Sequence, residues 1–130
     1  MIKKLAIIDD DELYVFITSK MIEKSQLVDC IDVFGNGQEG IEFIENNASD
    51  SDLLPDVIFL DLSMPIMDGW QFLDRFSEIS PKMTKNIKIY ICSSSISPDD
   101  ITKAKLRETV NDFIIKPLDL SKLKNMLSIR

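Results

Sequence analysis

Short apolar runs alternate with stretches of helical periodicity along the whole chain. Five runs are dominated by apolar and β-branched residues, which favours strands: KLAII (4–8), LVDCIDVF (27–34), DVIFLD (56–61), IKIYIC (87–92) and VNDFIIK (110–116). DVIFLD is apolar at its four central positions, which is typical of a strand that is buried on both faces of a parallel sheet.

A stretch with helical spacing follows each of these runs. After the first, Leu13, Phe16, Ile17 and Met21 recur at helical intervals, and an aspartate at the entrance can cap the helix. The other four stretches are QEGIEFIEN (38–46), GWQFLDRFSEI (69–79), SPDDITKAKLRE (97–108) and LDLSKLKNMLSI (118–129). Gly, Pro and polar residues separate the elements, as in the loop NNASDSDLLPD before the third strand.

This alternation predicts the fold class. Five strands alternating with five helices indicate an α/β, doubly wound (βα)5 domain of the flavodoxin-like type, with a parallel sheet covered on both faces. Right-handed crossovers leave few topologies, and we expect the strand order 2-1-3-4-5. Because the chain shows no repeat and no low-complexity tract, we expect residues 1–130 to form a single domain without an output domain.

Composition and charge exclude several classes of function. A net charge of −7 argues against a nucleic-acid or anionic-membrane surface, which needs a basic patch. No apolar run approaches the roughly 20 residues of a membrane span. The N-terminal apolar stretch is too short for a signal peptide, so we expect a cytoplasmic protein.

Cysteine and histidine usage narrows the chemistry. Cys30 and Cys92 lie inside apolar runs and are predicted to be small buried residues, not a disulfide or a metal site. The chain contains no histidine, which excludes histidine catalysis, histidine metal ligands and a phosphohistidine on this chain. Any phosphohistidine chemistry therefore needs a partner's histidine.

Polar and charged residues stand at the carboxyl ends of four predicted strands. They are Asp9 and Asp10 after the first strand, Asp61 after the third, Ser93 at the end of the fourth, and Lys116 with Pro117 after the fifth. Ligands of such sheets bind at the carboxyl ends, where the strand order reverses, so the three carboxylates should converge there. Clustered carboxylates repel each other unless a cation binds them, and an all-oxygen site favours Mg²⁺.

These motifs, in this order, resemble the receiver domain of bacterial response regulators, the phosphoacceptor components of two-component systems. The resemblance spans essentially the whole chain and rests on the acidic pair, on Asp61 followed by LSMPIMDG, on Ser93, and on the Lys116-Pro117 pair. Single-domain chemotaxis regulators and sporulation phosphorelay regulators are the most similar types. Each motif alone would indicate only a helix cap, a turn or a strand end.

The resemblance implies a site and its chemistry. Asp61 would accept a phosphoryl group from a phosphohistidine on a sensor kinase or a histidine phosphotransfer protein. Mg²⁺ would be bound directly by Asp10, through water by Asp9, and also by Asp61 and the backbone carbonyl of Ser63. Lys116 would contact a phosphoryl oxygen, and the peptide bond before Pro117 is often cis in this family. Such a protein catalyses only its own phosphorylation and dephosphorylation.

The resemblance also implies how the signal leaves the site. The Ser93 hydroxyl would donate to a phosphoryl oxygen, and the Phe113 ring would change its packing in response. A downstream protein would dock on the fourth helix, fifth strand and fifth helix, and the chain would be a monomer or a weak dimer. The family more often has threonine at the Ser93 position and tyrosine at the Phe113 position.

Other functions share parts of this pattern. A haloacid-dehalogenase-type phosphatase also uses a strand-end aspartate, but it needs a second acid two residues later, where this chain has Ser63. A flavodoxin-like mononucleotide protein needs a phosphate-binding loop after the first strand, where DDDE would repel phosphate. A degenerate receiver would bind partners without phosphorylation, although all four site positions are intact here.

Overall fold

The structure of the 130-residue chain is a computed structural model, which describes residues 2–95 and 97–127. The strands are β1 (Ile2–Ile8), β2 (Val28–Phe34), β3 (Val57–Leu60), β4 (Lys88–Ser93) and β5 (Val110–Ile115). The helices are α1 (Glu12–Ser25), α2 (Gly37–Asn46), α3 (Gly69–Ile79), the 3-10 turn η1 (Ser80–Lys82), α4 (Pro98–Lys105) and α5 (Leu120–Leu127). The last predicted helix was expected to reach residue 129, and residues 128 and 129 lie outside the described part of the chain.

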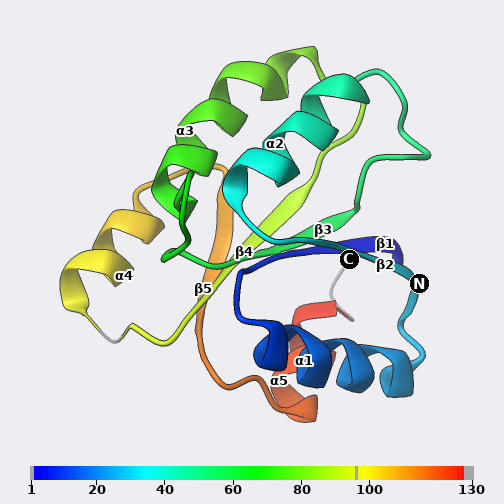
Figure 1. Cartoon of the computed structure of the whole chain (residues 1–130), viewed down its shortest axis with the longest axis vertical. Coiled ribbons are helices and arrows are strands. Elements are labelled where there is room, and N and C mark those ends of the chain that lie inside the picture. The colour runs from blue at the N-terminus through cyan, green and yellow to red at the C-terminus, as the bar shows by residue number, and fades with distance from the viewer. Residues whose placement is uncertain (1, 96, 128–130) are drawn as a thin grey trace.

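The five strands form one parallel sheet in the order β2-β1-β3-β4-β5, which confirms the predicted fold class and topology. Helices α2, α3 and α4 lie on one side of this sheet, and α1 and α5 lie on the other (Figure 1). All four residues of β3 are buried, as expected for a central strand covered on both faces. No helix among the described residues is both long and apolar enough to cross a membrane.

Two layers of buried apolar side chains fill the space between the sheet and the helices. One layer joins β1, β3 and β4 to α2 and α3, with Phe72 at its centre. The other joins the opposite face of the same strands to α1 and α5, through Phe59 and Leu123. Alternate side chains of each central strand therefore enter different layers, which fixes the register of the sheet.

Helix α1 was predicted with an apolar stripe of four residues, of which Met21 packs against the core and the other three do not. Leu13, Phe16 and Ile17 are 68%, 60% and 52% exposed, while Thr18 and Ile22 are the buried residues of the helix. Helical spacing alone therefore identified the helix and not the face that packs. Three neighbouring exposed apolar side chains are unusual for a helix surface that contacts only water.

The prediction that Cys30 is buried is wrong, whereas Cys92 is buried as predicted. Cys30 lies on β2, an edge strand in which Asp29, Cys30 and Val33 are exposed. A strand at the edge of a sheet is covered by helices over only part of its faces. An apolar run on such a strand can therefore include exposed positions.

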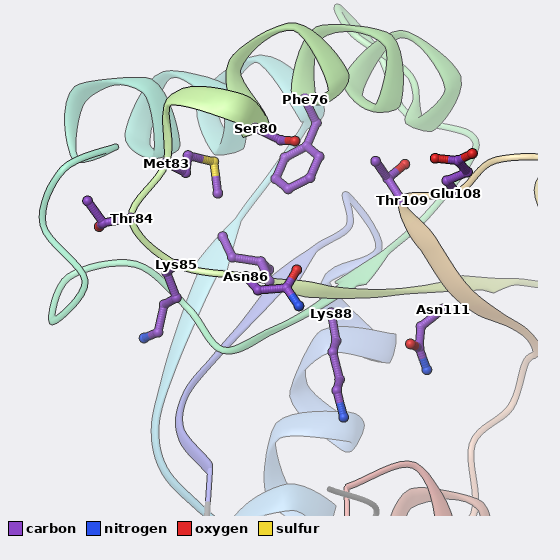
Figure 2. A pocket seen from close by; sticks show the side chains of 11 residues that line it. Phe76, Ser80, Met83, Thr84, Lys85, Asn86, Lys88, Glu108, Thr109 and Asn111 are labelled. Atoms are coloured by element: carbon purple, nitrogen blue, oxygen red, sulfur yellow. The ribbon is translucent and has the colours of Figure 1, made fainter.

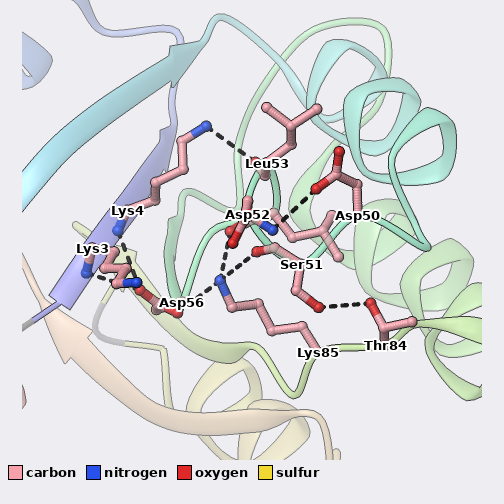
Figure 3. Close-up of polar contacts among 10 residues, drawn as sticks. Lys3, Lys4, Asp50, Ser51, Asp52, Leu53, Asp56, Thr84 and Lys85 are labelled. Atoms are coloured by element: carbon pink, nitrogen blue, oxygen red, sulfur yellow. Dashed lines mark hydrogen bonds and ion pairs between the residues drawn. The ribbon is translucent and has the colours of Figure 1, made fainter.

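The loop between α2 and β3 is held at the end of the sheet where the strands begin (Figure 3). Lys85 Nζ donates to the carbonyl oxygens of Ser51 (2.8 Å) and Leu54 (2.9 Å) and pairs with Asp56 Oδ1 (2.9 Å). Asp56 Oδ2 also accepts hydrogen bonds from the backbone N–H groups of Lys3 (2.9 Å) and Lys4 (3.2 Å). The loop is thus fixed to β1 and to the segment before β4.

Candidate functional site

Three aspartates meet at the carboxyl ends of β1 and β3, as the strand order predicts. One carboxylate oxygen from each of Asp9, Asp10 and Asp61 lies within 4.8 Å of the others. Asp9 is 3% exposed and Asp61 is 8% exposed, whereas Asp10 is open to solvent. Two largely buried carboxylates this close to each other need a positive charge nearby.

Lys116 supplies that charge from the end of β5. Its Nζ lies 2.8 Å from Asp9 Oδ2 and 3.4 Å from Asp61 Oδ1. The backbone N–H of Lys116 donates to the Ser93 carbonyl at 2.8 Å, which ties the residue to the end of β4. The Lys116–Pro117 peptide bond is cis. Four strand ends therefore bring Asp9, Asp10, Asp61, Ser93 and Lys116 into one site.

One ammonium group shared between two carboxylates leaves Asp61 poorly neutralised. Burial, followed by the charge of Asp9, raises the pKa of the Asp61 carboxyl from 3.8 to about 6, against the opposing effect of Lys116. Burial on its own lowers the pKa of Lys116, but the hydrogen bond to Asp9 and the charges of Asp61 and Asp9 raise it overall. Lys116 is therefore protonated at neutral pH, and Asp61 gains from any further cation.

The third residue of the acidic cluster has a structural role. Asp11 is the N-cap of α1, and its Oδ1 accepts the backbone N–H of Tyr14 at 3.1 Å. The backbone N–H of Asp11 in turn donates to Asp9 Oδ1 at 2.9 Å. The run of acidic residues thus divides into a helix cap, Asp11, and two residues of the charged site.

Ser93 begins a chain of hydrogen bonds that runs through Ser95 to the start of α4. It is 5% exposed, and its Oγ accepts the backbone N–H of Ser95 at 3.1 Å. Ser95 Oγ donates to Asp100 at 2.8 Å and accepts the backbone N–H of Ser97, the N-cap of α4, at 3.2 Å. The Ser93 hydroxyl proton is not used in these bonds. Phe113 is half-buried on β5, in register with Ile91 of β4.

Asp10, Asp61, Ser93 and Lys116 line a cleft of about 570 Å³. Ser63 and Met64 from the loop after β3, Ser94 and Ser95 from the loop after β4, and Trp70 at the start of α3 complete its walls. Trp70 is partly buried and packs on the core. Trp70 also lines the cleft, and Lys103 Nζ lies 4.4 Å from the centroid of its ring.

The loop after β3 is shaped by the MDG turn. Asp68 caps α3 in a capping box with Gln71, and the Gly69 N–H donates to the Leu62 carbonyl at 2.9 Å. A Cβ at position 69 would lie 2.5 Å from the Asp61 carbonyl oxygen, so only glycine fits against the backbone of the central aspartate. Ile66 in the same loop has φ 70°, a strained value for a β-branched residue.

Tyr14 is a site residue that sequence reasoning missed. Its ring centroid lies 4.0 Å from Lys116 Nζ, although the two residues are far apart in the chain. Burial raises the pKa of the Tyr14 hydroxyl, so the side chain is neutral throughout the physiological range. Its position in the first turn of the helix that follows β1 was the signal available in the sequence, because such a turn begins at the carboxyl end of the sheet.

A second cleft, of about 550 Å³, lies at the opposite end of the sheet (Figure 2). It is formed by the end of α3, the segment before β4 and the start of β5, with Phe76, Met83 and Ile87 among its lining residues. Among the described residues that line it, Glu108 is the single carboxylate. This cleft therefore lacks the clustered acids that distinguish the first.

Comparison with known proteins agrees with this geometry. The family model of the response regulator receiver domain matches residues 5–128. A hybrid signal transduction histidine kinase L from Dictyostelium discoideum is 29% identical over 129 residues, which cover 98% of this chain and 7% of that protein. A protein-glutamate methylesterase/protein-glutamine glutaminase from Methanococcoides burtonii is 34% identical over 131 residues, which cover 98% of this chain and 34% of that protein. The chain thus spans only a small part of these two relatives.

Solved structures show the same fold. A two-component response regulator from Cytophaga hutchinsonii is 28% identical, with a TM-score of 0.88 over 98% of this chain and 95% of that one. A chain from a CheX-CheY-BeF3-Mg²⁺ complex of Borrelia burgdorferi is 21% identical, with a TM-score of 0.80 over 98% and 90% of the two chains. The second likeness concerns the fold alone.

The fold and the acidic site define a flavodoxin-like α/β domain with a charged cluster at the carboxyl ends of its strands. The chain belongs to the response regulator receiver domain family of two-component systems. Its cluster of Asp9, Asp10 and Asp61 is compatible with the Mg²⁺ pocket of that family.

Proposed function

We propose that Asp61 is the phosphoacceptor of this receiver domain and takes a phosphoryl group from a partner's phosphohistidine. The observation that carries the proposal is the incomplete neutralisation of a buried carboxylate: Lys116 Nζ is closer to Asp9 (2.8 Å) than to Asp61 (3.4 Å). An oxygen of Asp61 is therefore available as a nucleophile in a cleft that is open to solvent. In this proposal the chain is a switch and does not turn over a separate substrate.

The transfer needs one bond to break and one to form. The phosphorus–nitrogen bond of the phosphohistidine breaks, its electron pair leaves with the imidazole, and a phosphorus–oxygen bond forms to Asp61. The transition state is largely dissociative, so the protein's main task is to position the reactants and neutralise charge. Lys116 neutralises one phosphoryl oxygen, and the Ser93 hydroxyl, whose proton is not used in the bond from Ser95, can donate to another.

Asp9, Asp10 and Asp61 fit a Mg²⁺ ion, because their oxygens already converge and their charges exceed what Lys116 can balance. We propose the Ser63 carbonyl as a further ligand, since Ser63 lines the same cleft. When bound, the ion adds positive charge for the phosphoryl oxygens. Asp10→Ala should weaken Mg²⁺ binding, as measured by calorimetric titration.

In this proposal the phosphohistidine donor is a sensor histidine kinase or a histidine phosphotransfer protein, since residues 1–130 contain no histidine. The exposed Leu13, Phe16 and Ile17 stripe on α1 supports a docking surface for that donor, because α1 starts beside Asp10. Phe16→Ser should slow transfer from such a protein severalfold and leave labelling by acetyl phosphate unchanged. If the protein donor phosphorylates Phe16→Ser as fast as wild type, α1 is not part of the docking surface.

The signal would leave through the face made by α4, β5 and α5. Phosphorylation adds up to about two negative charges and three acceptor oxygens, which draw the Ser93 hydroxyl. Phe113, half-buried on the neighbouring strand, would then repack and change a surface that includes Ile101, Lys105 and Lys122. Coupling is reciprocal, so the downstream partner should raise the affinity for beryllofluoride, an aspartyl-phosphate mimic. Ser93→Ala should weaken this coupling.

The decisive experiment is phosphorylation by acetyl phosphate with Mg²⁺, followed by intact-protein mass spectrometry. A mass increase of one phosphoryl group in the wild type, lost in Asp61→Asn, supports the proposal. Beryllofluoride binding with Mg²⁺ gives an independent answer. A wild type that takes neither phosphoryl group nor beryllofluoride would instead be a degenerate receiver that binds its partners without phosphorylation.

A further inference from the structure

The Lys116 ammonium group lies over the aromatic ring of Tyr14. Tyr14 lies in the first turn of α1, and its backbone N–H is fixed by the Asp11 cap at 3.1 Å. Its ring centroid is 4.0 Å from Lys116 Nζ, which is within the distance of a cation–π contact. The Lys116 side chain is only 14% exposed, so the contact forms in a partly desolvated place, where cation–π attraction is strongest.

Among the described residues, the Lys116 ammonium group has three contacts of two kinds. Two are the carboxylates of Asp9 (2.8 Å) and Asp61 (3.4 Å), and the third is the Tyr14 ring (4.0 Å). Both carboxylates would change partners in the proposed reaction, since each is a candidate metal ligand and Asp61 also takes up the phosphoryl group. The ring is the one contact of the three that keeps its chemistry throughout.

The Tyr14 hydroxyl does not explain why this side chain is here. It is buried, and among the described residues it has no hydrogen-bond partner. The polar side chains beside this hydroxyl are those of Thr18 and Cys92, and neither belongs to the charged site. The feature of Tyr14 that meets a functional group is the face of its ring.

We propose that Tyr14 is a positioning residue for Lys116: the face of its ring holds the ammonium group beside Asp61 through a cation–π contact. This inference rests on the proposed phosphorylation of Asp61 and adds a residue to that site. A lysine side chain has a long flexible stem and loses much rotational freedom when it is held. A fixed ring beside the ammonium reduces the number of positions it samples when Asp9 and Asp61 turn to other partners.

The test compares a ring-preserving and a ring-removing substitution. Tyr14→Phe keeps the ring face, whereas Tyr14→Leu fills much of the space without it. Phe43→Leu is a matched control, because Lys4 Nζ lies 5.7 Å from the Phe43 ring centroid, in a cation–π contact away from the acidic site. Acetyl phosphate labelling with Mg²⁺ should be about 3- to 10-fold slower in Tyr14→Leu. It should stay within about twofold of wild type in Tyr14→Phe and Phe43→Leu.

A second measurement does not depend on phosphorylation. In the metal-free protein, the ring current of Tyr14 should shift the NMR signals of the Lys116 ε-methylene protons upfield. This shift should persist in Tyr14→Phe and Phe43→Leu and disappear in Tyr14→Leu. If wild type is not phosphorylated at all, the proposed function fails, and this shift still decides whether the ring holds the ammonium group.

Two outcomes would overturn the inference. One is a folded Tyr14→Leu protein labelled at the wild-type rate, and the other is Tyr14→Phe labelled as slowly as Tyr14→Leu, which would assign the effect to the hydroxyl. Thermal melts identify any variant that fails to fold. If Tyr14→Leu fails, Tyr14→Met, which also lacks a ring, takes its place with the same expected slowing.

Discussion

The short strand β3 is flanked by two aspartates that are each paired with a lysine. One of these carboxylates is well neutralised and the other is not. Asp56, just before β3, accepts two backbone N–H groups and the Lys85 ammonium group. Asp61, just after β3, shares the Lys116 ammonium group with Asp9. One carboxylate has three donors, whereas two carboxylates compete for one cation.

The competition explains the opposite pKa shifts. Burial of Asp56 acts to raise the pKa of its carboxyl, but the hydrogen bonds from Lys85, Lys4 and Lys3 outweigh it, so the pKa is lowered. At Asp61, burial and the charge of Asp9 outweigh Lys116, and the pKa is raised to about 6. An Asp–Lys pair therefore stabilises the fold when enough donors neutralise the carboxylate. When they do not, the carboxylate can bind an added cation.

The largest expected difference between the two aspartates is in phosphorylation. Asp61→Asn should reduce labelling by acetyl phosphate to an undetectable level, because the nucleophilic oxygen is lost. Asp56→Asn should be labelled as wild type is, since Asp56 lies at the other end of β3. Mass spectrometry of the intact variants measures both. Labelling of Asp61→Asn at the wild-type rate would show that the acceptor is another residue.

The second difference is in the stability that each pair supplies. Asp56→Asn should lower the free energy of unfolding by about 2 kcal/mol, because it weakens the hydrogen bonds that hold the loop before β3. Asp74→Asn is the control: its ion pair with Arg107 involves a carboxylate that is 68% exposed, so the loss should be under about 1 kcal/mol. Urea unfolding at neutral pH measures both, and equal losses would contradict the structural role of Asp56.

The third difference is in the sign of the change in the free energy of unfolding when each aspartate ionises. The pKa of Asp61 is about 6 in the folded protein against an ordinary value of 3.8, so ionising Asp61 destabilises the fold as the pH rises through this range. In EDTA at pH 7.5, Asp61→Asn should therefore raise the free energy of unfolding by about 1–2 kcal/mol. The gain should vanish near pH 4, where Asp61 is protonated in the folded protein.

Asp56 should show the reverse dependence. Its folded-state pKa is lowered, so its contribution is present above the ordinary pKa and is lost as the pH falls towards the folded value. Urea unfolding of both Asn variants between about pH 2 and pH 8 gives the two profiles, with the Asp56 change expected below its ordinary pKa of 3.8 and the Asp61 change above it. Parallel pH profiles for Asp56→Asn and Asp61→Asn would refute the contrast between the two ends of β3.

The smallest expected effect concerns backbone strain at the active end. Ile66 has φ 70° and is 78% exposed, so Ile66→Gly should relieve strain without loss of packing. We expect a gain of about 0.5–1 kcal/mol in the free energy of unfolding. Gln26 has φ 59° at the C-cap of α1, and Gln26→Gly should gain less because glutamine is not β-branched. A loss of stability in Ile66→Gly would mean that the isoleucine side chain makes a net favourable contact.

The sequence was sufficient for the parts of the molecule that depend on local pattern and topology. The alternation of apolar runs and helical stretches predicted the sheet order, and the sheet order predicted that Asp9, Asp10 and Asp61 would converge near Lys116. These inferences succeed because parallel strands place their carboxyl ends at one edge, whatever the side-chain details.

The parts that depend on three-dimensional packing could not be predicted. Helical spacing does not show which face of α1 meets the sheet, so the exposure of Phe16 was not expected. The position of β2 at the sheet edge exposes Cys30 within an apolar run. The contacts of Tyr14 with Lys116 and of Asp56 with Lys85 join residues far apart in the chain, and neither leaves a local pattern.

Trp70 gives this protein an intrinsic optical reporter. It is the only tryptophan in the sequence, so its fluorescence comes from a single place, the wall of the cleft that contains Asp61. Lys103 of α4 and Arg107, which follows α4, lie over its ring, at 4.4 Å and 5.4 Å from the centroid. Nearby cations affect indole emission, so a shift of α4 or the arrival of a phosphoryl group should change the signal. Ligand binding can thus be followed in unlabelled protein.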